Sequence, residues 1–354
     1  MIHRTLSTQK LVLLAALVLA GSTALAGAAG AAPTPASGKH RVGQVSRYGV
    51  MITSPSTRLQ AARNLNAKRL RISVKLDNLP SGPMQSAIDA GFQVQMTADA
   101  TSFPSSPPKP SVYRAELGHA LDLYPTPLVT IENEETADKF YAGTPQQYLD
   151  QLRIAIPVVH QRGVKIADGG LVSLGVQLAT WYDLWHRGKH SAADSYAQLA
   201  FPDSRAGGAI IDDLPNSSHP NRPILAHTPK AKETLDDTLT LIAGFRGLNM
   251  DYVNFHWYQS TPAALVTTVS YLRRATGKPV VTNEIGQFDL SPQTMLGLLD
   301  RTATLHIPWV IWFGSDGGGG AMGLVNADGS LRANGRAFRS FLAQCDGKVN
   351  CGRG

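Results

Sequence analysis

Carboxylate side chains stand at the ends of two apolar, strand-like runs of this 354-residue sequence. Glu132 and Glu134 close the run LVTIENE, with Asn133 between them, and Glu284 closes the run PVVTNE. Two facing carboxyl groups can divide acid–base and nucleophilic work, because one can be protonated while the other is ionised. A single acid at a strand end has a plainer explanation, since it can pair with an arginine or be solvated in a loop.

Histidine and aromatic side chains occur on two further strand-like runs. In NFHWYQ the two-residue period of a strand puts His256 and Tyr258 on one face, and VIWFGS carries Trp312 near its end. Isolated aromatic rings are usually core residues, but rings beside paired carboxylates suit the apolar faces of sugars. The combination therefore favours a carbohydrate substrate.

Strand-like and helix-like runs alternate along most of the chain. Strands are predicted at 47–53, 69–74, 92–98, 127–134, 164–170, 251–258, 279–286 and 307–315. The clearest helices are predicted at 56–69, 144–163, 230–247, 261–277 and 291–306. Eight such repeats predict an α/β fold, a (β/α)8 TIM barrel, with a helical insertion after strand five between about Leu171 and Pro229. Active sites of such barrels lie at the C-terminal ends of the strands, where Glu134 and Glu284 are expected.

The first residues have the composition of an export signal. Arg4 and Lys10 precede an apolar run that ends in the small-residue triplet at 24–26, so 1–32 is predicted to be a signal peptide with its cleavage region. An uncleaved membrane anchor is the alternative, but the run is shorter than a bilayer span of roughly 20 residues. We therefore expect a secreted protein, extracellular or periplasmic, with no membrane association in its mature form.

The rest of the chain divides into three predicted parts. Residues 33–44 are expected to be a flexible segment, 45–344 the catalytic barrel, and 345–354 a short tail. Both cysteines of the chain, Cys345 and Cys351, lie in this tail. A close cysteine pair in an exported protein most simply forms one disulfide.

Charge and motif content argue against several other classes of function. Removal of 1–32 lowers the formal net charge from +7 to +5, and the basic residues are scattered, so no nucleic-acid interface is predicted. Two cysteines without neighbouring histidines cannot supply a four-ligand zinc site. The GGGAMG segment from Gly318 formally matches a dinucleotide-binding pattern, but no helix opens after it, so a flexible loop over the barrel mouth is expected instead. No cofactor or metal is expected.

The order of these residues along the chain resembles the clan A retaining glycoside hydrolases, a (β/α)8 group. The segments FYAGTPQQYLDQL and GLVNADGSLRANGRAFRSFL resemble its β-xylosidase-like branch. The resemblance implies that Glu134 is the acid/base at the end of strand four and that Glu284 is the nucleophile at the end of strand seven. The substrate-binding residues that it implies are Arg71, Asn133, His256, Tyr258 and Trp312.

The sequence departs from the pattern of that group at two points. Glu135 stands where proline is common, which puts the loop after strand four in doubt. Glu132 is a rival acid, because strand alternation would turn it to the same side as Glu134 but deeper in the barrel. We prefer Glu134 as the acid/base.

The predicted activity is cleavage of O-glycosidic bonds by double displacement, with the two carboxyl groups about 5–5.5 Å apart. The expected partner is an oligosaccharide, a polysaccharide or another glycoside, and no loop of the sequence identifies the sugar or its linkage. A non-catalytic carbohydrate- or cell-wall-binding barrel is an alternative, because a fold does not guarantee a function. A transglycosylase using the same residues is another.

Overall fold

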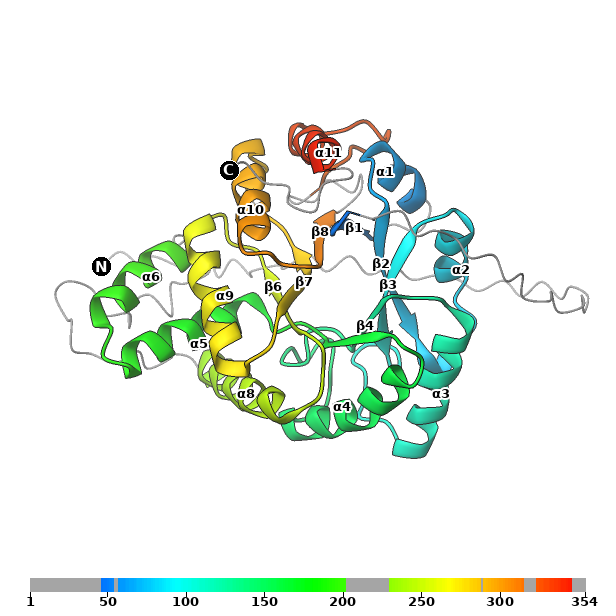
Figure 1. Ribbon diagram of the computed structural model, residues 1–354, viewed down its shortest axis with the longest axis horizontal. Coiled ribbons are helices and arrows are strands. Elements are labelled where there is room, and N and C mark those ends of the chain that lie inside the picture. Colours follow the sequence, from blue (N-terminus) through cyan, green and yellow to red (C-terminus); the bar gives the residue numbers. More distant parts are fainter. Residues whose placement is uncertain (1–45, 54–56, 202–228, 288, 315–322, 346–354) are drawn as a thin grey trace, which may run out of the picture. The chain divides into compact units, whose positions relative to one another are not determined.

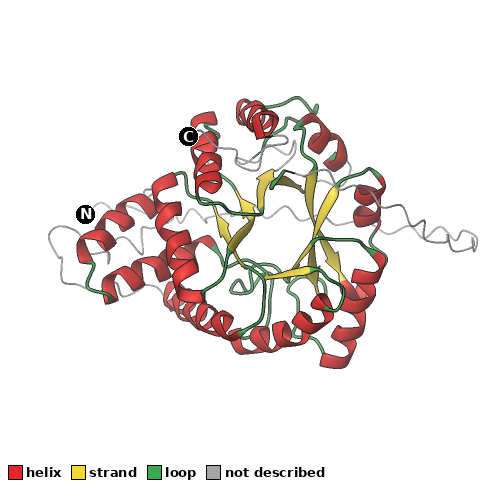
Figure 2. Cartoon of the chain, viewed as in Figure 1, coloured by secondary structure: helices red, strands yellow, loops and turns green. Residues whose placement is uncertain are grey.

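Eight parallel β-strands surrounded by helices form the fold (Figure 1 and Figure 2). The computed structural model describes residues 46–53, 57–201, 229–287, 289–314 and 323–345. The strands are β1 (Tyr48–Ile52), β2 (Arg69–Lys75), β3 (Gln93–Asp99), β4 (Leu128–Ile131), β5 (Lys165–Asp168), β6 (Val253–Trp257), β7 (Val280–Ile285) and β8 (Val310–Gly314). The α-helices are α1 (Arg58–Asn64), α2 (Gly82–Asp89), α3 (Pro110–Leu123), α4 (Pro145–His160), α5 (Ser173–His186), α6 (His190–Ala200), α8 (Pro229–Gly247), α9 (Pro262–Thr276), α10 (Pro292–Thr304) and α11 (Ala333–Cys345).

The strands follow one another in the order β5-β4-β3-β2-β1-β8-β7-β6. The two outer strands of this order meet through isolated parallel bridges, Ala167 with Tyr252 and Leu171 with Phe255. These bridges close the sheet into a (β/α)8 barrel, as the sequence predicts. All carboxyl ends of the strands therefore lie at one mouth of the barrel.

Local sequence explains where several helices begin and end. Thr144 caps α4 in a capping box with Gln147, and Ser291 accepts a hydrogen bond from the Thr294 backbone at the start of α10. Gly277 ends α9 with a left-handed φ of 71°, a conformation that glycine adopts without strain. These caps satisfy backbone groups that the helix ends would otherwise leave without partners.

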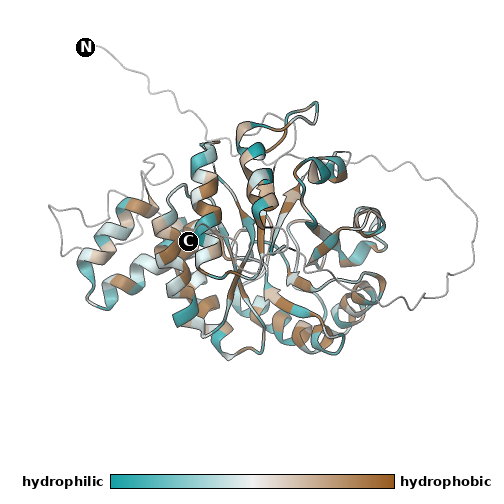
Figure 3. Ribbon diagram, turned by 45° about the horizontal axis from the view of Figure 1, so that its top comes forward, coloured by the Kyte–Doolittle hydropathy of each residue, from teal (hydrophilic) through white to brown (hydrophobic). Residues whose placement is uncertain are grey.

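Two apolar layers hold the barrel together. The larger layer lies between the strands and the helices and includes Trp257, Trp312 and Phe338. A smaller cluster comprises Leu128, Ala167, Val281, Trp309 and Ile311. Successive residues of β8 alternate between the two layers, as the two-residue period of a strand requires. The helices carry both polar and apolar residues (Figure 3), as expected for helices that cover a core on one side.

Strand β7 contains one extra residue relative to both neighbours. Between Asn254 and His256 the facing β7 residues advance from Val281 to Glu284, and the pairing with β8 shifts in the same stretch. Such a β-bulge re-aims the side chains that follow it. Here it turns Glu284 inward.

Some predicted features differ from the structure or lie outside the described residues. Strand β4 ends at Ile131, three residues earlier than predicted. Helices α5, α6 and α8 lie between β5 and β6, and residues 202–228 of the predicted insertion are not described. The predicted signal peptide (1–32), the flexible segment (33–44), the loop from Gly318 and Cys351 of the predicted disulfide also lie outside the described residues. Within the described ranges, no helix combines the length and apolarity that a membrane crossing requires.

Candidate active site

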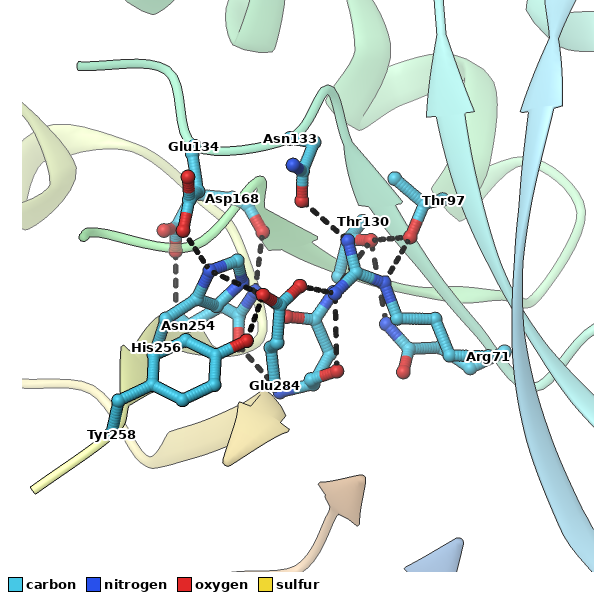
Figure 4. Close-up of polar contacts among 12 residues, drawn as sticks. Arg71, Thr97, Thr130, Asn133, Glu134, Asp168, Asn254, His256, Tyr258 and Glu284 are labelled. Atoms are coloured by element: carbon cyan, nitrogen blue, oxygen red, sulfur yellow. Dashed lines mark hydrogen bonds and ion pairs between the residues drawn. The ribbon is translucent and has the colours of Figure 1, made fainter. Parts of the chain in front are cut away.

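Glu284 is held at the barrel mouth by two side chains from other strands (Figure 4). Arg71 on β2 donates a hydrogen bond from Nη1 to Glu284 Oε2 at 2.5 Å, and Tyr258 donates from its hydroxyl to Glu284 Oε1. Burial alone would raise the pKa of Glu284, but His256 and Arg71 outweigh it and lower that pKa below its ordinary value. Glu284 is therefore an ionised carboxylate at neutral pH.

Arg71 is almost fully buried, with 2% of the residue exposed, and hydrogen bonds hold its guanidinium on three further sides. Its Nε donates to Thr97 Oγ1 at 3.0 Å, and its Nη2 donates to Asn133 Oδ1 at 2.5 Å. Its Nη1 also reaches the backbone carbonyl of Asn283 at 3.2 Å. The planar guanidinium thus links β2, β3, the loop after β4 and β7 in one plane of hydrogen bonds.

Glu134 lies across the mouth from Arg71 and contacts His256. The Glu134 Oε1 atom is 2.9 Å from His256 Nδ1, and the same nitrogen is 3.8 Å from Glu284 Oε1. Burial lowers the pKa of His256, but Glu284 and Glu134 together outweigh burial and raise it above the ordinary value. The two carboxylates are therefore bridged by a ring that can carry a positive charge.

The acids of the mouth are close together and reachable from solvent. One oxygen of Glu134 and one of Glu284 lie within 4.8 Å of each other. Their side chains are 12% and 10% exposed, in contrast to fully buried His256. A ligand entering the mouth would therefore meet the two carboxylates and not the imidazole.

The same three residues have the composition of a metal site, because one ligand atom of each lies within 4.8 Å of the others. Both nitrogens of His256 already face hydrogen-bond partners, Glu134 and Asn283. Arg71 adds a fixed positive charge against Glu284. A cation here would have to displace these hydrogen bonds beside a guanidinium, so the arrangement suits the protein's own ion pairs better than a metal.

Glu132, the rival acid, lies elsewhere. Its Oε1 accepts hydrogen bonds from the Ala100 backbone at 3.1 Å and from Gln151 Nε2 at 2.5 Å. Burial and the nearby Asp99 raise the pKa of Glu132 to about 8. Glu132 and Glu134 have left-handed φ angles of 62° and 42°, so the chain turns after β4 and strand alternation does not apply to them. The prediction that both acids face the same way is therefore wrong.

Two further acids are buried beside the mouth. Asp168, at the end of β5, accepts hydrogen bonds from the backbones of Asn254 at 2.6 Å and Gly170 at 3.3 Å. Burial raises the pKa of Asp168 to about 7. Burial and Asp168 raise the pKa of Glu135 well above its ordinary value. Glu135, the residue in place of the common proline, is therefore buried beside Asp168.

Trp312 does not reach the mouth. It is 1% exposed, belongs to the layer between strands and helices, and its ring centroid lies 6.3 Å from that of Phe338 on α11. The predicted role of Trp312 in a sugar subsite is therefore wrong, because the alternation of β8 turns its ring outward. Phe313, the next residue, lies edge-on to Tyr258 with 5.9 Å between the centroids.

The structure thus brings together Arg71, Asn133, Glu134, His256, Tyr258 and Glu284, and leaves Trp312 out. Sequence reasoning missed Asn254, Asn283, Asp168, Gly170 and Phe313. Strand periodicity could have revealed Asn254, which stands two residues before His256 on β6. Asn283 and Phe313 depend on the bulge and on strand register, for which the sequence carries no clear signal.

Comparisons with known proteins agree with the fold. No protein-family model matches the chain, and no curated protein matches it. Among solved structures it is similar to a GH128 subgroup VI exo-β-1,3-glucanase from Aureobasidium namibiae, with TM-score 0.51, 9% identity and coverage of 83% of this chain and 96% of that one. It is also similar to an exo-β-1,4-mannosidase from Opitutaceae bacterium strain TAV5, with TM-score 0.50, 14% identity and coverage of 83% and 56%. At these identities the similarity establishes the barrel fold alone, and the resemblance to the β-xylosidase-like branch stays a prediction.

Proposed function

We propose that this protein is a secreted retaining glycoside hydrolase in which Glu134 is the acid/base and Glu284 is the nucleophile. The observation that carries the proposal is the pair of partly exposed carboxylates at the mouth, with oxygens within 4.8 Å of each other. Retaining enzymes have carboxyl groups about 5–5.5 Å apart, whereas inverting enzymes need about 6.5–9.5 Å to admit a water molecule. The short separation supports retention.

The charges around the two acids suit their different roles. Glu284 has a lowered pKa beside His256 and Arg71, as a nucleophile that must be ionised requires. Glu134 faces a histidine whose pKa is raised, so a proton is held at that side of the mouth. One acid is then ionised while a proton is available at the other.

The reaction would proceed in two displacements. The Glu284 carboxylate attacks the anomeric carbon while the proton held at Glu134 moves to the leaving oxygen, which breaks the glycosidic bond and forms a glycosyl-enzyme ester. A water molecule then attacks the same carbon, gives its proton to Glu134, and releases Glu284 as a carboxylate. Two inversions at one carbon give net retention.

The similar barrels from Aureobasidium namibiae and the Opitutaceae bacterium are named as enzymes that act on β-1,3-glucan and β-1,4-mannosides. β-Linked hexosides are therefore included among the first substrates to test, alongside the β-xylosides that the sequence resemblance suggests. The signal peptide predicted at 1–32 supports export. The test of that part is the N-terminal sequence and location of the protein produced by its own host.

The experiment that tests the activity is a panel of mechanism-based labels. The protein is incubated with epoxide and fluorosugar derivatives of glucose, mannose and xylose, and peptides are then analysed by mass spectrometry. The expected result is one covalent sugar on the peptide that contains Glu284. Binding of an oligosaccharide without any labelling or release of reducing ends would instead favour a carbohydrate-binding barrel.

A further inference from the structure

We propose that Asn254 and Asn283 are positioning residues that fix which nitrogen of His256 carries a hydrogen, so that His256 and Glu134 hold one proton between them. Neither asparagine contacts the carboxylates directly through its side chain. Their effect passes through the imidazole ring, and its meaning for catalysis rests on the proposed function.

The orientation of the Asn254 amide is set by the backbone. The Asn283 N–H donates to Asn254 Oδ1 at 2.9 Å, and a backbone N–H can only donate. The Nδ2 of Asn254 must therefore point the other way, where it donates to Asn283 Oδ1 at 2.7 Å and to the Asp168 carbonyl at 3.3 Å. Both of these partners are oxygen atoms that accept hydrogen bonds, as this orientation of the Asn254 amide requires.

The Asn283 amide is fixed in turn, and with it one nitrogen of His256. Asn283 Oδ1 accepts from Asn254, while its Nδ2 donates to Thr130 Oγ1 at 3.3 Å. His256 Nε2 lies 2.9 Å from the same Asn283 oxygen, which has no hydrogen to give. The Nε2 atom of His256 must therefore carry a hydrogen.

Gly170 makes room for this arrangement. Its φ is 112°, and a Cβ at this position would lie 2.2 Å from His256 Nε2 and 2.9 Å from Asn254 Nδ2. Any side chain here would push the ring or the amide out of contact. The chain thus has a glycine where the amide–imidazole contact passes closest to the backbone.

The other nitrogen of His256 faces Glu134 at 2.9 Å. With Nε2 occupied, one proton can lie between Glu134 Oε1 and His256 Nδ1, on either atom. Removing it sets the Nδ1 lone pair against the Glu134 carboxylate, which is unfavourable. The neutral form with its hydrogen on Nδ1 would relieve this, but it would set an Nε2 lone pair against Asn283 Oδ1.

Most charged groups around the His256 ring favour its protonated form, and one opposes it. Glu284 on β7 and Asp168 on β5 favour a positive ring, as Glu134 does, and Arg71 on β2 opposes it. In the proposed reaction the pair gives its proton to the leaving oxygen. The lone pair and carboxylate that then face each other make Glu134 a stronger base toward the incoming water.

The first test reads the hydrogen positions without any turnover. Protein labelled with ¹⁵N-histidine is titrated from about pH 5 to pH 9 while the ring nitrogens are observed by NMR. His256 is assigned by the signal that disappears in His256→Gln. We expect Nε2 to stay protonated throughout in the native protein. A neutral native His256 that has its hydrogen on Nδ1 and none on Nε2 would overturn the proposal, whatever the variants do.

The variants test the asparagine's part. In Asn283→Ala the neutral ring with its hydrogen on Nδ1 and none on Nε2 should appear. The midpoint for loss of the shared proton should fall by about one pH unit, because the Asn283 oxygen no longer disfavours that neutral ring. Thr130→Val is the matched control, since Thr130 contacts the same amide at Nδ2 and leaves the acceptor oxygen in place. An unchanged hydrogen position in folded Asn283→Ala would contradict the proposal.

The basic limb of the kcat/KM pH profile supplies the catalytic readout. It should move to lower pH by about one unit in Asn283→Ala and stay in place in Thr130→Val. A protein with the expected NMR result but no glycosidase activity refutes the proposed function and leaves the hydrogen assignment standing. An active enzyme whose His256 has no hydrogen on Nε2 refutes the hydrogen assignment and leaves the proposed function standing.

Discussion

Two acidic clusters lie near the same mouth of the barrel, and the pKa values of buried acids in the two are shifted in opposite directions. The mouth cluster comprises Arg71, Glu134, His256, Tyr258 and Glu284. In it, Glu284 has a lowered pKa although the residue is buried. The partners supplied by other strands, and not exposure to water, keep this acid ionised.

The buried carboxyl pair, Asp99 and Glu132, shows the other outcome. Lys75 contacts Asp99 at 2.9 Å, yet burial still raises the pKa of Asp99 to about 6 and that of Glu132 to about 8. Glu132 has an amide, a backbone N–H and the Ser105 hydroxyl as partners but no guanidinium. The comparison teaches that burial raises the pKa of an acid unless its charged and hydrogen-bonding partners outweigh burial, as they do only at Glu284 among these three acids, and this suits Glu284 to its proposed role as nucleophile.

The largest expected effect separates the two clusters by activity. Glu284→Gln should lower kcat by about 10⁴-fold or more, because it removes the atom that bonds to the sugar in the proposed reaction. Glu132→Gln replaces a more deeply buried acid two residues from Glu134 and should retain most of the activity. Steady-state kinetics of both variants on the same glycoside checks this. Comparable losses in the two would mean that the active acid is misassigned.

The second effect tests the other acid of the mouth cluster. Glu134→Ala should slow substrates with poor leaving groups by about 10²–10⁴-fold, since general acid catalysis is lost. Activated aryl glycosides need little protonation and should lose far less in the first step. Added azide should restore turnover of those substrates and yield a glycosyl azide with retained configuration, identified by proton NMR. An inverted product would assign Glu284 a role other than nucleophile.

The third prediction concerns stability and the buried carboxyl pair. The pKa of Glu132 is raised from 4.5 to about 8, so the folded state binds a proton that the unfolded state has lost within this window. Stability therefore falls as pH rises through the window, by roughly 2 to 4 kcal/mol for this group. Urea unfolding at several pH values should show this slope flattened in Glu132→Gln, and part of it should persist because Asp99 and Asp168 are shifted in the same direction. A slope as steep as that of the native protein would contradict the assignment.

The smallest effect concerns the two neighbouring aromatic residues of β8. Phe313→Ala should lower kcat/KM by about three- to tenfold, because its edge-on contact with Tyr258 is lost and the hydroxyl on Glu284 is less firmly held. Trp312→Phe should lower the unfolding temperature while leaving kcat/KM near the native value, since this ring packs against α11. The reverse pattern would return Trp312 to the mouth.

The sequence predicts the barrel well because its signal is repeated eight times. Strand periodicity and the order of the motifs also locate Arg71, Glu134, His256, Tyr258 and Glu284 at one mouth. Periodicity and motif order do not predict the direction of each side chain, because that direction depends on local irregularities of one residue. The end of β4 at Ile131, the left-handed turns at Glu132 and Glu134 and the bulge in β7 each change which way a side chain points. None of them has a distinctive composition.

The wrong prediction that Trp312 lies at the mouth has the same origin. Trp312 and Phe313 are adjacent aromatic residues, so composition alone cannot say which one faces inward. The register of β8 against β1 and β7 decides it, and register is a property of the whole sheet. Asn283 likewise depends on the bulge in β7, and the role of Asn254 depends on hydrogen-bond partners that the sequence does not reveal.

The way the barrel closes has a consequence for its motions. Between β5 and β6 the sheet is joined by isolated bridges, whereas β2 pairs with β3 at seven positions and β1 pairs with β8 at five. Local opening is least costly where few backbone hydrogen bonds must break together, so amide hydrogens along this seam should exchange before those of β1, β2 and β8. His256 lies on β6 beside the seam and contacts Glu134, whereas Arg71 lies within the ladder of β2 with β3. A seam that opens first would leave His256 more mobile than Arg71, which is held between paired strands.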